Sequence, residues 1–445
     1  MTHRPVESRG LAAATSIASP TRLLTAFFTL ALAGCAPDES GTVEATELCP
    51  GGDARIELPE GFCAQLVTDG VPGARHIDVA PNGDVFVARR NRRENNQTVP
   101  GGITVLRDTD GDGRADERAD WGENGGNEVL LADGFLYFAP DDAVLRYPLE
   151  AGSMQPAGQP DTIVSDLPAD GNHAAKSLAL GEDGSLYVNI GSPSNACMTE
   201  ARTPESPGMD PCPELDTRAG IWRFSADALG QTLSDGTRFA TGLRNTVALR
   251  VHPDDGELYG VIHGRDQLDA MWPGVFDVED NTEMPSEEFV RITEGADFGW
   301  PYCFHDPRTG RKLLTPEYGG DGEMVGRCSD KDMPMIAFPA HWAPNDLEFY
   351  TGESFPERYR GGAFIAFHGS WNRAPNPQEG FQVVFAPSSS GGFGPEWETF
   401  ADGFRNEQDA DAHARPVGVA MGPDGVLYVS ESVNGRIWRI VYEGS

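Results

Sequence analysis

Lysine is almost absent from this chain. Three of its 34 cationic residues are lysines, whereas 69 residues are acidic, so the formal net charge is −35. A protein that tracks nucleic-acid phosphates needs a basic stripe, and the sequence has none, which excludes nucleic acid as a partner. Stretches with the apolar period of a helix are also few, whereas 53 glycines and 34 prolines predict many turns.

An apolar segment long enough to span a bilayer is lacking at the N-terminus. The run Leu23–Ala33 is too short and is typical of a signal-peptide core. It leads into L-A-G-C, which ends at Cys35 and resembles the bacterial lipobox, in which the cysteine is lipidated. We therefore expect a signal peptide over 1–34, an acidic flexible tether over 35–53, and an exported lipoprotein that faces the periplasm. Ala36 favours the outer membrane; a plain secretory signal is the alternative.

The motifs C-x-x-C-H and C-x-x-C are missing, so the sequence predicts neither a covalently bound c-type haem nor a zinc site of that kind. Without Cys35, six cysteines remain, and an even number in an exported chain indicates three disulfides. Six cysteines allow fifteen pairings. Pairing neighbours along the sequence predicts Cys49–Cys63, Cys197–Cys212 and Cys303–Cys328.

What the chain does have is a repeat: an apolar strand, a turn rich in Gly, Asp and Asn, and a second apolar strand. Such turns between period-2 apolar runs are typical of β-hairpins. The six copies span residues 76–89, 127–139, 177–191, 246–263, 347–368 and 417–431. A further strand follows each copy, beginning at Ile103, Ala143, Ile221, Glu288, Phe381 and Ile437.

Regular units of this kind bury their faces by stacking on their neighbours. The repeat therefore predicts an all-β fold, a six-bladed β-propeller over 54–445, with its site on the central axis. The strand candidate 55–67 precedes the first hairpin, and pairing it with the last blade would close the ring without a free edge. A β-sandwich with a coincidental hairpin rhythm is the alternative.

Polar residues concentrate at one position of the repeat, directly before each inner strand and directly after its partner. In a propeller these positions face one end of the channel. They include Arg75, His76, Asn127, His173, Lys176, Arg244, Asn245, His263, Arg265, Asp266, His341, His368, Trp371, Asn372, Arg373, His413 and Arg415. An acidic chain that gathers His, Arg and a rare Lys at one mouth predicts an anion site. Each residue alone has a structural role as its alternative, so the prediction rests on their coincidence.

These stretches resemble a known family. R-H-I-D-V-A at Arg75, G-N-H-A-A-K-S at Gly171, G-L-R-N at Gly242, H-G-R-D at His263 and R-P-V-G-V-A at Arg415 are similar to the quinoprotein glucose/sorbosone dehydrogenases, in particular the sorbosone-dehydrogenase-like branch. The resemblance covers residues 58–442. It implies a propeller that binds pyrroloquinoline quinone (PQQ) and Ca²⁺ and oxidises a sugar or sugar-derived aldehyde or alcohol by hydride transfer to the quinone. Electrons would pass to an external acceptor, a quinone or a cytochrome c.

The resemblance also implies roles for individual residues. His173 matches the base that takes the substrate's hydroxyl proton, and a reference pKa near 6.5 suits that task. Arg244 matches the cation that stabilises negative charge developing on the quinone oxygen. The expected cofactor-binding residues are Arg415, Lys176, Asn245, Trp371, Asn372, Arg373 and His341, of which the cations would pair with carboxylates and Trp371 would stack. The expected Ca²⁺ ligands beside the quinone are Gly264, Arg265 and Asp266.

A second metal signal lies in the loop D-T-D-G-D-G-R-A-D. Asp108, Asp110 and Asp112 occupy positions one, three and five of an EF-hand-like loop, and Asp116 follows. Position twelve is Ala119, so the usual bidentate glutamate is missing. The spacing predicts a structural Ca²⁺ loop, with an acidic turn between strands as the alternative.

Two other functions are compatible with the fold. A Ca²⁺-dependent lactonase would need Asp, Glu and Asn side chains around an axial metal, whereas these positions are richer in His and Arg. A non-enzymatic binding propeller would share the architecture without the chemistry, because fold alone does not establish activity.

Overall fold

The computed structural model describes residues 52–389, 391–405 and 412–444. The predicted signal peptide, the lipidation site Cys35, Cys49 and most of the tether lie outside the described residues. No helix in the described part of the chain is long and apolar enough to cross a membrane.

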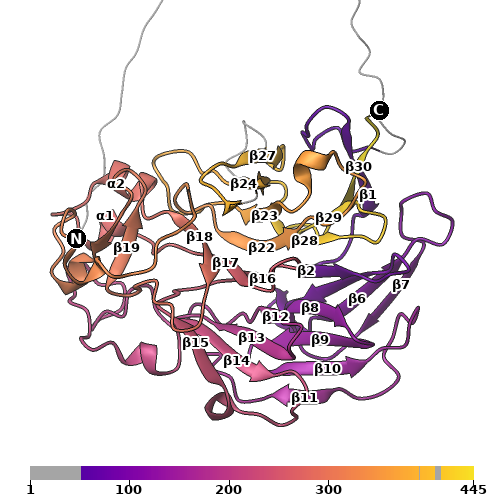
Figure 1. Ribbon diagram of the computed structural model, residues 1–445, viewed down its shortest axis with the longest axis horizontal. Helices are drawn as coiled ribbons and strands as arrows, with labels where there is room; N and C mark the ends of the chain where they lie inside the picture. Colours follow the sequence, from indigo (N-terminus) through magenta and orange to yellow (C-terminus); the bar gives the residue numbers. More distant parts are fainter. Residues whose placement is uncertain (1–51, 390, 406–411, 445) are drawn as a thin grey trace, which may run out of the picture. The chain divides into compact units, whose positions relative to one another are not determined.

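Six four-stranded antiparallel sheets form the fold, which confirms the six-bladed propeller (Figure 1). From the axis outward, the first blade consists of β2 (Ala74–Val79), β3 (Val85–Arg89), β6 (Gly102–Arg107) and β7 (Glu117–Trp121). The second consists of β8 (Gly126–Ala132), β9 (Phe135–Pro140), β10 (Val144–Pro148) and β11 (Asp161–Val164). The third consists of β12 (Leu178–Leu180), β13 (Ser185–Ile190), β14 (Gly220–Ser225) and β15 (Thr237–Thr241). The fourth blade consists of β16 (Ala248–Val251), β17 (Leu258–Ile262), β18 (Glu287–Ile292) and β21 (Ile336–Phe338). The fifth consists of β22 (Pro344–Phe349), β23 (Ala363–His368), β24 (Phe381–Ala386) and β27 (Glu398–Ala401). The sixth consists of β28 (Pro416–Met421), β29 (Leu427–Glu431), β30 (Ile437–Tyr442) and β1 (Phe62–Thr68). All six predicted hairpins and all six third strands are present.

The inner strands close into a ring. Each contacts the next in the order β2, β8, β12, β16, β22, β28, and β28 contacts β2 again. The outermost strand of the last blade comes from the other end of the chain, because β1 pairs with β30 in the register Phe62↔Tyr442. The predicted closure is confirmed: β1 makes the last blade four-stranded and joins the two ends of the propeller.

The hairpin turns follow their sequences. Between β8 and β9 the two turn residues Asp133 and Gly134 have φ of 52° and 78°. Two successive positive φ values define a type I′ turn, whose twist matches that of the flanking strands, and Asp-Gly is among its preferred pairs.

Six apolar clusters hold the blades together, one at each blade interface. Trp438 and Phe364 are buried between the fifth and sixth blades, and Trp222 is buried between the second and third. Burying one large apolar side chain contributes about 1.5–3 kcal/mol. Stability is therefore spread around the ring, and the axis is free to carry polar groups.

Inserts decorate the fourth blade. The short helices α1 (Leu268–Met271) and α2 (Val278–Glu283) precede β18, and the hairpin of β19 (Cys303–Asp306) and β20 (Arg311–Leu314) follows it. Two further hairpins pair β4 (Arg92–Glu94) with β5 (Gln97–Val99) and β25 (Ser388–Ser389) with β26 (Gly392–Phe393). Short 3₁₀ turns cover Pro213–Asp216, Leu233–Asp235, Pro316–Tyr318, Gly326–Cys328 and Glu357–Tyr359.

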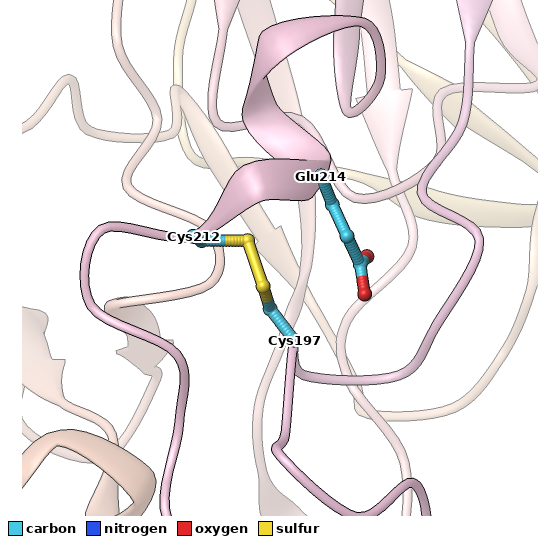
Figure 2. A group of neighbouring side chains, drawn as sticks. All are labelled: Cys197, Cys212 and Glu214. Carbon is cyan, nitrogen blue, oxygen red and sulfur yellow. A yellow bond between two sulfur atoms is a disulfide. The ribbon is translucent and has the colours of Figure 1, made fainter.

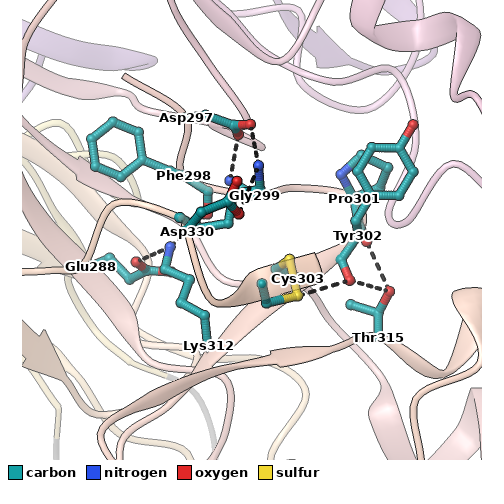
Figure 3. The surroundings of a disulfide bond; sticks show 12 residues. Glu288, Asp297, Phe298, Gly299, Pro301, Tyr302, Cys303, Lys312, Thr315 and Asp330 are labelled. Atoms are coloured by element: carbon teal, nitrogen blue, oxygen red, sulfur yellow. Dashed lines mark hydrogen bonds and ion pairs between the residues drawn. A yellow bond between two sulfur atoms is a disulfide. The ribbon is translucent and has the colours of Figure 1, made fainter. Parts of the chain in front are cut away.

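Two of the three predicted disulfides, Cys197–Cys212 and Cys303–Cys328, are confirmed. Cys63 is disulfide-bonded as well, and its predicted partner Cys49 lies outside the described residues. Beside Cys303, the buried Lys312 forms an ion pair with Glu288 at 2.7 Å (Figure 3). This ion pair joins the insert to β18, whereas the Cys303–Cys328 disulfide crosslinks the insert internally.

Candidate functional site

Arg244 is the centre of the mouth. It lies between β15 and β16 and is 4% exposed. Its Nη1 donates to Gly264 O at 2.7 Å, and its Nη2 donates to Asp266 Oδ2 at 2.8 Å. Burial lowers its pKa, although the guanidinium stays charged next to the Asp266 carboxylate. The structure therefore presents a fixed positive charge at the position predicted from the sequence.

His173, just before β12, is held in one tautomer. Its Nδ1 lies 2.7 Å from the carbonyl oxygen of Ser192, and a carbonyl can only accept, so Nδ1 carries the hydrogen. Nε2 is then the basic nitrogen. Burial, followed by the positive charge of Arg244, lowers the pKa of His173 to about 3. The imidazole is neutral at physiological pH, which is the form that a general base requires.

Asn195 connects Arg244 with the loop of Asp266, and nothing in the sequence pattern indicated it. Its Oδ1 accepts from Arg244 Nη2 at 3.0 Å and from the backbone N–H of Asp266 at 2.9 Å. Its Nδ2 donates to Asp266 O at 2.8 Å. One amide thus fixes both Arg244 and the loop that carries Asp266.

The loop of Asn195 is itself anchored. Cys197 forms the disulfide with Cys212, and Glu214 lies next to this bond (Figure 2). Ser194 Oγ donates to Glu214 Oε1 at 2.6 Å and accepts from the backbone N–H of Cys197 at 2.9 Å. Asn195 therefore has little freedom to move.

Other predicted residues gather around Asp266. Asn372 Nδ2 donates to Asp266 Oδ1 at 3.0 Å, and His341 Nδ1 lies 3.9 Å from the same oxygen. The Oδ1 atoms of Asn372 and Asn245 are buried without a hydrogen-bond partner, so both could accept from a bound molecule. Trp371 is 58% exposed, unusual for an indole and suitable for a stacking surface.

Other predicted cations are used within the protein. Lys176 is fully buried and donates to Pro168 O at 2.8 Å and to Ala174 O. Arg265 forms a buried ion pair with Glu317 at 2.6 Å. Arg373 Nη1 donates to Thr282 O at 2.9 Å, and its Nη2 lies 3.0 Å from Glu379. These three side chains hold loops in the wall of the mouth.

Arg415 and His413 complete the predicted set. Arg415 Nη1 donates to His368 O at 3.3 Å and to Gly369 O at 3.2 Å, so it stays at the mouth beside blade five. His413 is placed differently from the prediction. The charges that act on it are those of Arg55, Arg436, Asp53 and Glu431, not those of Arg244 or His173.

His76 lies in a second polar layer on the axis. Its Nδ1 is 2.8 Å from Glu128 Oε2 and its Nε2 is 2.6 Å from Asn345 O. Both nitrogens therefore face acceptors, which suits the doubly protonated ring, and the pKa of His76 is raised by Asp346 and Glu128 against the opposing effect of burial. This layer provides its own counter-charges.

The structure brings together three of the four carboxylates of the predicted calcium loop, and calcium there stays a prediction. Ligand oxygens of Asp108, Asp110 and Asp116 lie within 4.8 Å of one another. Asp112, which the spacing also predicted, is not in this group, and its Oδ1 accepts from the backbone N–H of Arg114 at 2.8 Å. Asp108, Asp110 and Asp116 also accept backbone N–H groups of this loop, so what sets Asp112 apart is that its oxygens lie outside the group.

The residues present suit the cofactor that the resemblance implies. PQQ carries carboxylates and a flat ring system, and the mouth offers the guanidinium of Arg244, the unpartnered acceptors of Asn245 and Asn372, and the exposed indole of Trp371. For Ca²⁺, the hard oxygens beside them are Gly264 O and the Asp266 carboxylate. The Arg265 side chain is paired with Glu317, so only the backbone carbonyl of Arg265 could join that donor set, as the resemblance implies.

Fold and site together define a class: six-bladed propellers with a neutral histidine and a buried guanidinium at the axial mouth. Within that class the chain belongs to the TrAA12-like family, whose profile matches residues 56–443. This confirms the resemblance to PQQ-dependent sugar dehydrogenases; the sorbosone-like branch stays a prediction.

Individual relatives support the same assignment. The chain is 24% identical over 246 residues to a PQQ-dependent pyranose dehydrogenase of Coprinopsis cinerea, covering 47% of this chain and 31% of that protein. It spans 31% to 48% of the length of the curated relatives that it matches. Among solved structures, the holo PQQ domain of the Coprinopsis enzyme matches with a TM-score of 0.69 and 20% identity, over 88% of this chain and 98% of that one. The calcium structure of a Trichoderma reesei family AA12 enzyme gives 0.69 and 18%, over 87% and 97%.

Proposed function

We propose that this chain is a PQQ-dependent sugar dehydrogenase that oxidises a hydroxyl or aldehyde carbon of a sugar. The observation that carries the proposal is the pairing of His173 and Arg244: a neutral imidazole with Nε2 available, next to a fixed guanidinium. The relatives in its family act with PQQ on sugars. The sorbosone-type preference is part of this proposal.

His173 takes the substrate's hydroxyl proton at Nε2, while Ser192 O keeps the ring oriented through Nδ1. PQQ, when bound, supplies the two-electron acceptor for the hydride that leaves the carbon. Arg244 places positive charge where negative charge develops, and Asn195 holds that guanidinium in position. A bound anion would offset the Arg244 charge that lowers the pKa of His173, and so raise its basicity towards neutral pH.

Three further points belong to the same proposal. Ca²⁺ would be held at the mouth by Gly264 O and the Asp266 carboxylate, and a second ion by the loop Asp108–Asp116. The protein would be exported and attached to the outer membrane by lipid at Cys35. Its electrons would go to an external quinone or cytochrome c.

Reconstitution tests the function. Purified protein is titrated with PQQ and Ca²⁺, and the cofactor's absorbance is recorded with and without sugars. We expect saturable binding and bleaching by a sugar in wild type, and binding without bleaching in His173→Gln. A hydrolysed lactone in the absence of quinone would instead show the lactonase, and no response to either compound would leave a binding propeller.

A further inference from the structure

A cavity of about 250 Å³ is lined in part by the loop that carries His173. Its lining comes from the loops of the first three blades and includes Arg75, Arg90, Asn127, Asp141, Asn172 and Ala174. Asn172 and Ala174 are the sequence neighbours of the proposed base, so the cavity shares the His173 loop although His173 itself is not part of the lining. Its volume is slightly below the roughly 300–1,000 Å³ typical of drug-sized ligands, which suits a single sugar ring.

Arg75 is the unusual residue of this cavity. It is 9% exposed, and its Nε donates to Asn127 Oδ1 at 2.8 Å. In the described part of the chain no carboxylate forms an ion pair with it, and its two terminal nitrogens have no hydrogen-bond partner. Burial, followed by the positive charge of Arg90, lowers its pKa to about 9, against the opposing charges of Asp346 and Asp141, neither of which forms an ion pair with it. A buried cation without a partner is costly, and an anion would relieve that cost.

Other buried arginines of this protein do not share that state. Arg244, Arg265 and Arg373 each have a carboxylate partner within 3.0 Å. In a chain with 69 acidic residues, a counter-ion for Arg75 would be easy to supply. Among the described residues Asp346 and Asp141 act on Arg75 without forming an ion pair with it, which leaves its close contacts open to an anionic ligand.

Arg90 adds a second charge to the cavity. It is exposed and forms no ion pair among the described residues, and its charge acts on Arg75. Asp141 is the one acidic residue of the lining and is exposed, so two cations oppose one anion. The amide of Asn172 lies at the same wall and offers hydrogen bonds for hydroxyl groups.

We propose that this cavity is a carboxylate subsite for the substrate, and that the enzyme takes an acidic sugar such as a hexuronate. Arg75 binds the carboxylate through its free terminal nitrogens, Arg90 contributes long-range attraction, and the sugar ring is held with its reacting hydroxyl at His173. This inference rests on the proposed function. The cofactor also carries carboxylates, so the test must separate the two sources.

The experiment compares glucuronate with glucose in wild type, Arg75→Gln, Arg75→Lys and Arg93→Gln. Arg93 is an exposed arginine outside the cavity, so Arg93→Gln is the control for loss of one charge. PQQ affinity is measured separately by titration for each variant. Glucuronate affinity is measured by calorimetry on protein with PQQ bound, a readout that needs no turnover.

We expect wild type to have the higher kcat/KM for glucuronate. Charge-assisted hydrogen bonds contribute about 1.5–3 kcal/mol, so Arg75→Gln should lower the glucuronate-to-glucose ratio of kcat/KM about 10- to 100-fold. Arg75→Lys should restore part of it, and Arg93→Gln should match wild type. Binding of glucuronate that depends on Arg75 would support the subsite even if no sugar is oxidised. A lack of sugar oxidation would overturn only the proposed function.

Two results would overturn the inference. If Arg75→Gln weakens PQQ binding and lowers both sugars equally, Arg75 serves the cofactor. If wild type binds glucuronate no better than glucose, the cavity is not a carboxylate subsite.

Discussion

In two polar layers along the same axis, the pKa of histidine is shifted in opposite directions. At the mouth, burial and the charges of Arg75, Arg415 and Arg90 hold the pKa of His368 well below its usual range. One layer deeper, Asp346 and Glu128 raise the pKa of His76 although that ring is completely buried. The difference shows that the neighbouring charges, and not burial alone, decide whether an axial imidazole is neutral or charged.

The deeper layer is internally balanced. Arg250 lies 3.3 Å from Glu348 and 3.8 Å from Asp346, and burial raises the pKa of Glu348 to about 7 and of Asp78 to about 6. The mouth, in contrast, has cations in excess of carboxylates at Arg75 and Arg90. The first arrangement suits a structural role and the second suits an anionic ligand.

The largest effect is expected at His173. If the mouth is catalytic, His173→Gln should bind PQQ almost normally and lose about 10²–10⁴-fold in kcat, the usual contribution of a general base. Arg244→Ala should also lower kcat, whereas Arg415→Ala should chiefly weaken PQQ binding. Quinone titration, melting temperature and kcat on the same preparations separate these roles. Full turnover in folded His173→Gln would show that the mouth is not catalytic through this histidine.

Asn195 should come next. Asn195→Ala removes the hydrogen bonds that hold Arg244 and the Asp266 loop, and hydrogen bonds to charged groups contribute about 1.5–3 kcal/mol. We expect kcat to fall about 10- to 100-fold with a smaller change in KM. Asn376→Ala is the control, because Asn376 also bridges loops but contacts Glu279 and Thr282 instead. A fall in melting temperature with unchanged kcat would make Asn195 purely structural.

Features with local sequence signals were predictable, whereas contacts between distant loops were not. The six hairpins, their third strands and the closing strand were predictable because their signals are local turns and alternation. The role of Asn195 was not, because it depends on loops from different blades meeting in space. Spacing placed Asp112 with Asp110, yet the turn directs it to Arg114 N. Adjacency to a strand placed Lys176 at the mouth, yet its ammonium is directed to backbone carbonyls.

The free energy of unfolding should depend on pH with opposite signs for the two layers. The folded pKa of His368 is lowered, so the unfolded chain binds more protons and stability falls as pH falls below about 6.5. The folded pKa of Glu348 is raised from 4.5 to about 7, so stability falls as pH rises through that window, by up to about 3 kcal/mol. In urea unfolding between pH 4.5 and 7.5, His368→Gln should remove a loss of stability towards low pH, and Glu348→Gln should remove a loss of stability towards high pH. The same change of slope in both variants would contradict the comparison.

The smallest effect concerns a third environment, the carboxylates of the loop Asp108–Asp116. They lie far more exposed than the axial acids, and their hard oxygens could hold Ca²⁺. Asp110→Asn should remove most of the Ca²⁺-dependent rise in melting temperature, whereas Asp112→Asn, at a residue whose oxygens lie outside the group, should retain it. A site with Ca²⁺ at 100 times its Kd contributes about 2.7 kcal/mol, and that contribution disappears in chelator. Because both variants remove one charge from the same loop, repulsion changes alike in the two. If Asp110→Asn lowers the melting temperature equally in Ca²⁺ and in chelator, the loop is an acidic turn without a metal.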